Sequence, residues 1–226
     1  MDKAKIIFLT IFSLSLSIIG CGEESGPTTQ KNPLVYEGSI VAIGDSLTEG
    51  LGVEEEFAYP ALLERQLMAR GHRYRVINAG ISGETSSGTL SRIKWVLRID
   101  PDIAILVIGA NDGLRGVNSD FIKSNITKII QSLKANDVIV VLGGMRIVQN
   151  LGKTYTTAFS KIYQEIAETE KVILIPFFLE GVAGEPKLNQ ADGIHPTAKG
   201  YRRIVENIYP YVVEAIKINA LIPRSF

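Results

Sequence analysis

The sequence predicts a three-layer α/β sandwich, in which helices cover both faces of a five-stranded parallel sheet. Five short apolar runs alternate with segments of helical period along residues 39–226. The runs are continuous rather than alternating in polarity, which is typical of parallel strands buried on both faces. The 226 residues, 46% of them apolar, suit one domain of this class.

The strands and helices follow one another in a regular order. The expected strands are Ile40–Ile43, Tyr74–Ile77, Ile103–Ile108, Val138–Leu142 and Val172–Ile175. Apolar stripes of helical spacing fall within Tyr59–Leu67, Ile122–Leu133, Tyr155–Ile166 and Tyr201–Ile208. Gly71 stops the first helix, and Asn118 or Ser119 caps the second. The last helix is expected to begin at Pro196 and to kink or end at Pro210.

The amino-terminal segment is expected to be a targeting signal. Lys3 and Lys5 precede the uncharged run Ile6–Ile19, which is too short to span a bilayer and suits a signal-peptide core. The end of the run leads into Ile18-Ile19-Gly20-Cys21, which resembles the lipobox of bacterial lipoproteins. The resemblance implies cleavage before Cys21 and lipidation of its thiol, and a plain signal peptide with a chance cysteine is the alternative.

The domain boundaries follow from this interpretation. Residues 1–20 form the signal peptide, and residues 21–38 form the lipidated cysteine with a polar, Gly/Pro-rich tether. Residues 39–226 form the folded domain, which we expect to be a monomer held beside a membrane of the bacterial cell envelope.

The composition excludes several function classes. Lys and Arg total 24, as do Asp and Glu, so the chain lacks the basic excess that nucleic-acid binding needs. A single cysteine cannot form an internal disulfide. With only two histidines besides, there are too few ligands for a zinc cluster. We therefore expect neither a nucleic-acid partner nor a metal.

A candidate nucleophile follows the first strand. In a doubly wound fold the chemistry lies beyond the carboxyl ends of the strands. There the first strand runs into Gly44-Asp45-Ser46-Leu47-Thr48-Glu49-Gly50, which can hold Ser46 exposed at the top of the sheet. A turn serine that caps the next helix is the alternative. The block is not a Gly-x-Ser-x-Gly elbow, because Thr48 occupies the second glycine position.

A serine nucleophile needs a base that works near neutral pH, and histidine is the usual one. His72 lies before the second strand, at the opposite edge of the sheet. His195 follows the fifth strand in Asp192-Gly193-Ile194-His195-Pro196. An acid three residues before a histidine can fold back and fix its tautomer, so Asp192 is the candidate orienting acid. Asp112, also beyond a strand end, is the rival acid.

Two further strand ends carry candidate hydrogen-bond donors. Acyl transfer needs donors aimed at the developing oxyanion. The Asn111 side chain follows the third strand, and the Gly83 N–H follows the second. Each could also be ordinary turn chemistry when it is considered singly.

The four loops together resemble the GDSL family of the SGNH hydrolases. Its four named residues fall at Ser46, Gly83, Asn111 and His195, in the family's order and spacing. The blocks Gly109–Gly116, Pro176–Phe178 and Asp192–Pro196 are closest to bacterial acyl-thioesterase/lysophospholipases and arylesterases. Ala110 stands where some members have glycine, which leaves the preferred acyl chain length open.

The resemblance implies a flavodoxin-like sheet of order 2-1-3-4-5 and hydrolysis of ester or thioester bonds without a cofactor. It implies that Ser46 attacks, His195 transfers the proton and Asp192 orients His195. The N–H groups of Ser46 and Gly83 and the Asn111 amide would hold the oxyanion, and lysophospholipids or aryl and alkyl esters would be substrates.

Two other functions stay open at this point. A carbohydrate O-acetylesterase of the same fold would need a polar and open acyl site. Apolar residues in the relevant loops argue against that site; they are Leu114, Val117, Phe177 and Phe178. A non-catalytic binding lipoprotein is the third possibility, although every motif residue is present.

Overall fold

The computed structural model describes residues 35–147 and 151–222. The predicted signal peptide, Cys21 and most of the expected tether lie outside the described residues. The sheet comprises β1 (Gly38–Gly44), β2 (Tyr74–Gly80), β3 (Ile103–Val107), β4 (Ile139–Gly143) and β5 (Ile173–Ile175). All neighbouring strands are parallel, in the order β2-β1-β3-β4-β5. The predicted α/β fold class is therefore confirmed.

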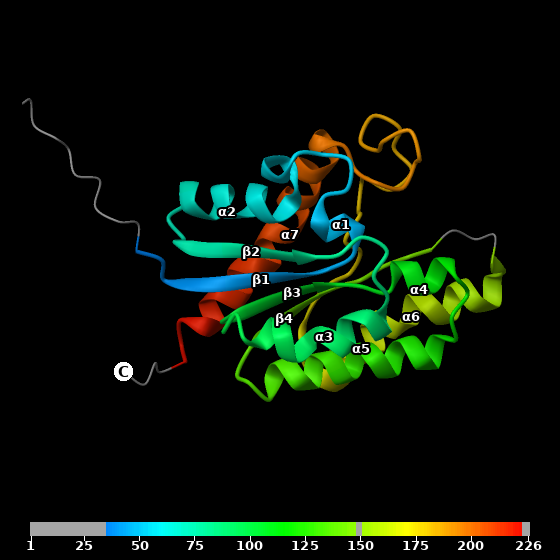
Figure 1. Cartoon of the computed structure of the whole chain (residues 1–226), viewed down its shortest axis with the longest axis horizontal. Helices are drawn as coiled ribbons and strands as arrows, with labels where there is room; N and C mark the ends of the chain where they lie inside the picture. The colour runs from blue at the N-terminus through cyan, green and yellow to red at the C-terminus, as the bar shows by residue number, and fades with distance from the viewer. Residues whose placement is uncertain (1–34, 148–150, 223–226) are drawn as a thin grey trace, which may run out of the picture. The chain divides into compact units, whose positions relative to one another are not determined.

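Helices cover both faces of this sheet. They are α1 (Ser46–Glu49), α2 (Tyr59–Ala69), α3 (Ser86–Leu97), α4 (Ala110–Leu114), α5 (Ser119–Lys134), α6 (Lys153–Glu170) and α7 (Ala198–Asn219). Figure 1 shows α2 and α7 on one face and α3 and α5 on the other, where α6 packs beside α5. The central strands β1 and β3 are almost fully buried, because helices cover them on both sides.

The register of the three strands at one side of the sheet determines where the functional loops begin. Gly44, the last residue of β1, pairs with Gly80 of β2 and with Val107 of β3. The carboxyl ends of these three strands are therefore level. The loops that follow them, which hold Ser46, Gly83 and Asn111, start from one edge of the sheet.

The last helix begins later than the sequence predicts and does not end at Pro210. It begins at Ala198 rather than Pro196, because the Thr197 side chain caps it by accepting a hydrogen bond from the Gly200 N–H. Pro210 does not end the helix, which continues to Asn219. An interior proline costs about 3 kcal/mol. Each large apolar side chain that α7 buries stabilises the fold by about 1.5–3 kcal/mol. The burial of Ile208 and Val212 around the proline therefore outweighs this cost.

Two further features escaped the sequence analysis. α3 carries buried polar side chains, Ser86 and Thr89, on the face that packs inward, so its apolar stripe is incomplete. β2 is less buried than the expectation for a parallel strand because it lies at the edge of the sheet. No helix in the described ranges is both long and apolar enough to cross a membrane.

Candidate active site

Ser46 follows β1 after a single intervening residue, Asp45. It is the first residue of α1, and the Asp45 side chain caps this helix by accepting a hydrogen bond from the Leu47 N–H at 3.0 Å. Gly44 has no room for a side chain, because a Cβ would lie 2.4 Å from the Val107 carbonyl oxygen. Glycine at this position therefore lets the end of β1 pack closely against β3 and against Thr48 of α1, which brings Ser46 to the end of the sheet.

The predicted serine, histidine and acid meet in the structure. His195 Nε2 lies 2.8 Å from Ser46 Oγ, although 149 positions separate the two residues. His195 Nδ1 lies 2.6 Å from Asp192 Oδ2. This is the geometry of a nucleophile, a base and an orienting acid.

The Asp192 carboxylate shapes its own turn. Its Oδ1 accepts hydrogen bonds from the backbone N–H groups of Ile194 and His195, at 2.9 and 3.0 Å. The hydrogen bond with the His195 ring, with help from these backbone groups, lowers the pKa of Asp192 far below its usual range. Asp192 therefore stays ionised and holds the ring with Nε2 directed at the serine.

The predicted oxyanion donors gather beside Ser46. The leading N–H groups of a helix have no acceptor within it, and Ser46 begins α1. Gly83 has a positive φ of 74°, which turns the chain after β2. Asn111 Nδ2 donates to the Glu84 carbonyl oxygen at 3.1 Å, so the Asn111 amide adjoins the turn that contains Gly83.

Asp45, to which the sequence analysis gave no role, orients the Asn111 amide. Asp45 Oδ2 accepts a hydrogen bond from Asn111 Nδ2 at 3.2 Å. The Asp45 side chain is buried, and this burial raises its pKa to about 6. With Glu84 O as the second acceptor, both Asn111 N–H groups are engaged, so an oxyanion must share or replace one acceptor.

A buried ion pair fastens the Gly83 turn to α3. Arg92 donates two hydrogen bonds to the Glu84 carboxylate, at 2.6 and 2.5 Å, and one to the Ala79 carbonyl oxygen at 2.7 Å. Thr89 Oγ1 donates to the same carboxylate at 2.9 Å. All of these groups lie on the chain that leads into or out of the turn, so the pair keeps Gly83 and the Glu84 carbonyl in place.

Asp112 and Phe178, which the sequence placed near the active site, have structural roles instead. Asp112 accepts hydrogen bonds from the Ser86 N–H and Oγ, at 2.8 and 2.7 Å, and is buried against α3. Phe178 is fully buried and packs edge-on against Tyr59, so it belongs to the core rather than to an acyl site. Their positions in the sequence, just after strand ends, did not show that these two side chains are buried rather than exposed at the active site.

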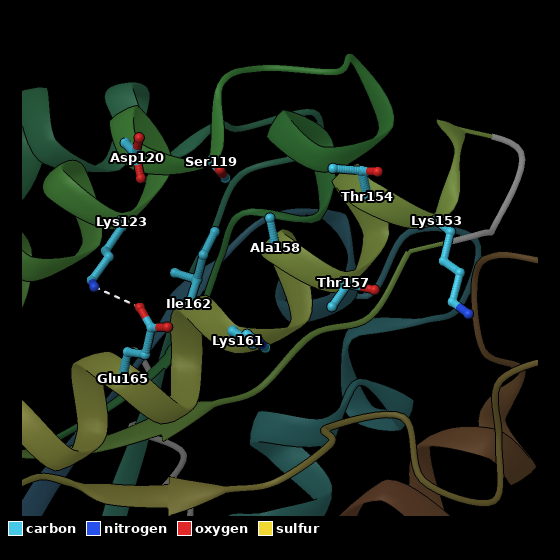
Figure 2. A pocket seen from close by; sticks show the side chains of 10 residues that line it. All are labelled: Ser119, Asp120, Lys123, Lys153, Thr154, Thr157, Ala158, Lys161, Ile162 and Glu165. Atoms are coloured by element: carbon cyan, nitrogen blue, oxygen red, sulfur yellow. Dashed lines mark hydrogen bonds and ion pairs between the residues drawn. The ribbon is translucent and has the colours of Figure 1, made fainter.

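A separate hollow of about 500 Å³ lies between the start of α5 and α6. Lys123 and Glu165 form an ion pair at 2.6 Å, which Figure 2 shows at one end of this hollow with Ile162 beside it. None of the catalytic candidates lines this hollow. Residues 35–147 and 151–222 contain no group of His, Cys, Asp and Glu side chains that could hold a metal ion.

Comparison with known proteins agrees with this geometry. The model of the GDSL-like lipase/acylhydrolase family matches residues 42–203. The chain belongs to this family. The hydrolase is 39% identical to esterase TesA of Pseudomonas aeruginosa over 173 residues, which is 76% of this chain and 86% of the relative. The crystal structure of TesA superposes with a TM-score of 0.76 at 38% identity, covering 78% of this chain and 99% of the other.

Two other relatives give the same family. The hydrolase is 35% identical to an arylesterase of Vibrio mimicus over 202 residues, covering 89% of this chain and 97% of the relative. It is 36% identical to thioesterase 1/protease 1/lysophospholipase L1 of Escherichia coli over 159 residues, covering 70% and 75%. The protein is accordingly a serine hydrolase that acts on ester bonds, and the non-catalytic binding alternative is set aside.

The Asn111→Ala variant should lower kcat by roughly 10²–10³-fold, the usual loss for one oxyanion donor. The variant should also be less stable by about 1–3 kcal/mol, because the buried Asp45 carboxyl loses one hydrogen-bond donor, but it should remain folded. Steady-state kinetics on a soluble ester and a melting curve test both statements. A variant with near-full activity would mean that Asn111 only supports the turn.

Asp192→Asn should reduce kcat by about 10⁴-fold, which is less than the roughly 10⁶-fold loss from Ser46→Ala or His195→Ala, since the acid assists rather than reacts. Asp112→Asn should instead lower the thermal midpoint, because it disturbs the buried contacts with Ser86. Parallel kinetics and melting curves of the four variants separate the roles. A larger kinetic loss from Asp112→Asn than from Asp192→Asn would reverse the assignment.

Asp45 should make the folded state less stable as pH rises from about 4 to about 6. Its pKa is higher in the folded protein, so the stability it contributes is complete below its ordinary pKa of 3.8 and is lost as pH rises toward 6. A displacement of about 2 pKa units corresponds to about 3 kcal/mol. Urea unfolding of wild type and Asp45→Asn across this range should show a difference of that order that favours the variant at pH 7. A difference that does not vary with pH would contradict this account.

Proposed function

We propose that Ser46 is the nucleophile of this hydrolase and forms an acyl-enzyme. Ser46 Oγ attacks the ester carbonyl carbon while His195 Nε2 accepts the serine proton. His195 then gives this proton to the leaving alcohol as the carbon–oxygen bond breaks. Water repeats the sequence on the acyl-enzyme and releases the acid. The 2.8 Å contact between Ser46 Oγ and His195 Nε2 is the observation that carries the proposal.

The charge that develops on the carbonyl oxygen would be held by the N–H groups of Ser46 and Gly83 and by the Asn111 amide. Asp45 and the Glu84 carbonyl fix the direction of that amide before substrate arrives. The amide is therefore oriented before charge develops, and the oxyanion has only to share or replace one of its two present acceptors.

The proposed substrates are single-chain acyl esters, including lysophospholipids, together with small aryl and alkyl esters. The names of the relatives, an esterase, an arylesterase and a thioesterase/lysophospholipase, support this class. Large apolar side chains are about half-exposed in the segments that follow β1, β2, β3 and β5. They are Leu51, Ile81, Leu114 and Ile194. Each acyl methylene that they cover contributes about 0.8 kcal/mol. A carbohydrate O-acetylesterase would gain nothing from these side chains.

The proposed location is the bacterial cell envelope, with a lipid on Cys21 as the anchor. The sequence supports this proposal through the lipobox-like Gly20-Cys21 and the preceding run Ile6–Ile19. A lipid on Cys21 would place the hydrolase beside its proposed lipid substrates.

A panel of p-nitrophenyl esters from acetate upward tests the substrate class. We expect kcat/KM to rise with acyl length up to a limit, and Ser46→Ala to abolish turnover of every ester. Lysophospholipid hydrolysis followed by fatty-acid release should depend on Ser46 in the same way. Hydrolysis of acetyl esters alone, with refusal of chains beyond about four carbons, would favour the O-acetylesterase instead.

The Cys21→Ala variant tests the anchor. It should lose membrane association in cell fractionation and keep full activity on short esters, because Cys21 lies outside the residues that form the site. A hydrolase with the signal sequence of a soluble secreted protein is the matched control. Continued partition of Cys21→Ala with membranes would exclude the lipid anchor.

A further inference from the structure

Asp192 and His195 lie on a short hairpin over residues 188–197. Asn189 and Pro196 form an antiparallel bridge, and the Gln190 N–H donates to the His195 carbonyl oxygen at 2.8 Å. The tip of the hairpin is in solvent, where the Asp192 side chain is 45% exposed. The hairpin therefore has its own backbone order, but a further contact must set its distance from the serine.

The Gln190 side chain supplies this contact. Its Nε2 donates to the Leu51 carbonyl oxygen at 2.7 Å and to the Pro196 carbonyl oxygen at 3.0 Å. Leu51 follows α1, and its own N–H donates to the Ser46 carbonyl oxygen at 3.1 Å. The Gln190 amide thus donates one hydrogen bond to the segment that follows α1 and one to the hairpin that carries His195.

These contacts form a closed ring. It runs from Ser46 through Leu51 and Gln190 to His195, and returns to Ser46 through the 2.8 Å contact between His195 Nε2 and Ser46 Oγ. Gly52 leaves space for the bridging amide, because a Cβ there would lie 2.1 Å from Gln190 Oε1. Gln190 is the only side chain in this ring besides the reacting pair.

We propose that Gln190 is a positioning residue that sets the separation of His195 from Ser46. The inference rests on the catalytic roles proposed above for these two residues. Gln190 touches no reacting atom and acts by holding the histidine hairpin against the loop that follows α1. A displacement of about 1 Å at reacting groups can cost about 10²-fold in rate.

Other contacts hold the hairpin in its fold, so the two roles can be separated. Asn189 Nδ2 donates to the carbonyl oxygens of Val182 and Glu185, at 2.6 and 2.9 Å, and fixes the base of the hairpin. The Asp192 carboxylate fixes its tip through the backbone N–H groups of Ile194 and His195. Loss of the Gln190 amide should leave the hairpin folded but free to shift relative to α1.

The first test uses Gln190→Met, which keeps the length of the side chain and removes both donors. The readout is the second-order rate at which a small organophosphonate labels Ser46, located by mass spectrometry, together with kcat and KM for a soluble acetate ester. We expect the labelling rate and kcat to fall by about 10²-fold while KM changes little. The low-field proton resonance of the His195–Asp192 hydrogen bond should persist, since that bond lies within the hairpin.

The second test uses Gln190→Glu, whose carboxylate would face two carbonyl oxygens. Only its protonated form can donate a hydrogen bond, so the ratio of variant to wild-type labelling rate should rise as pH falls toward the usual pKa of glutamate, about 4.3. Gln164→Glu on α6 is the matched control, because it makes the same change at an exposed residue that donates only to Glu168. Its ratio should stay near one at every pH.

Three outcomes decide the proposal. A labelling rate of Gln190→Met within about threefold of wild type would overturn it. Loss of the rate together with the low-field resonance would also overturn it, because Gln190 would then be needed for the fold of the hairpin. Loss of the rate with the resonance retained supports it. Labelling of wild type at a serine other than Ser46 would instead overturn the proposed function.

Discussion

The contact between Ser46 Oγ and His195 Nε2 is the constraint on which the site depends. It joins residues from the first and last parts of the domain at 2.8 Å. A parallel sheet makes such a contact possible, because every strand ends at the same edge and delivers its loop there. Because the carboxyl ends of β1, β2 and β3 are level, the loops that carry the site residues begin close together. Hydrogen bonds between the loops then supply the remaining precision.

Those hydrogen bonds are made by groups that are costly to bury. Asp45 keeps a buried carboxyl whose charged form is disfavoured, and the Glu84–Arg92 pair is removed from water beneath the turn that contains Gly83. Apolar residues at these places would pack the same space at less cost. These polar groups direct the Asn111 amide and the backbone around it. The site therefore has hydrogen-bond donors of fixed orientation at the cost of some local stability.

The sequence predicted the fold class and the meeting of Ser46, Asp192 and His195, because apolar runs locate buried strands and strand ends locate loops. It did not predict which polar residues support the site. Asp45 stands next to the nucleophile and Gln190 two residues before the acid, yet neither has a spacing that distinguishes a loop contact from a solvated turn. The continuation of α7 through Pro210 also required knowledge of what the helix packs against. Such roles depend on distances between segments that are far apart in the chain.

The direction of β1 has a consequence for how the hydrolase meets lipid. The described chain enters the strand at Gly38, and the nucleophile follows the other end of the strand at Gly44 (Figure 1). Seven residues of parallel strand separate these ends by about 20 Å. An enzyme anchored at Cys21 would bring its catalytic edge to the leaflet that holds it by turning on the expected tether of residues 21–38. Monomeric lipids that have left the bilayer would be within reach without that rotation.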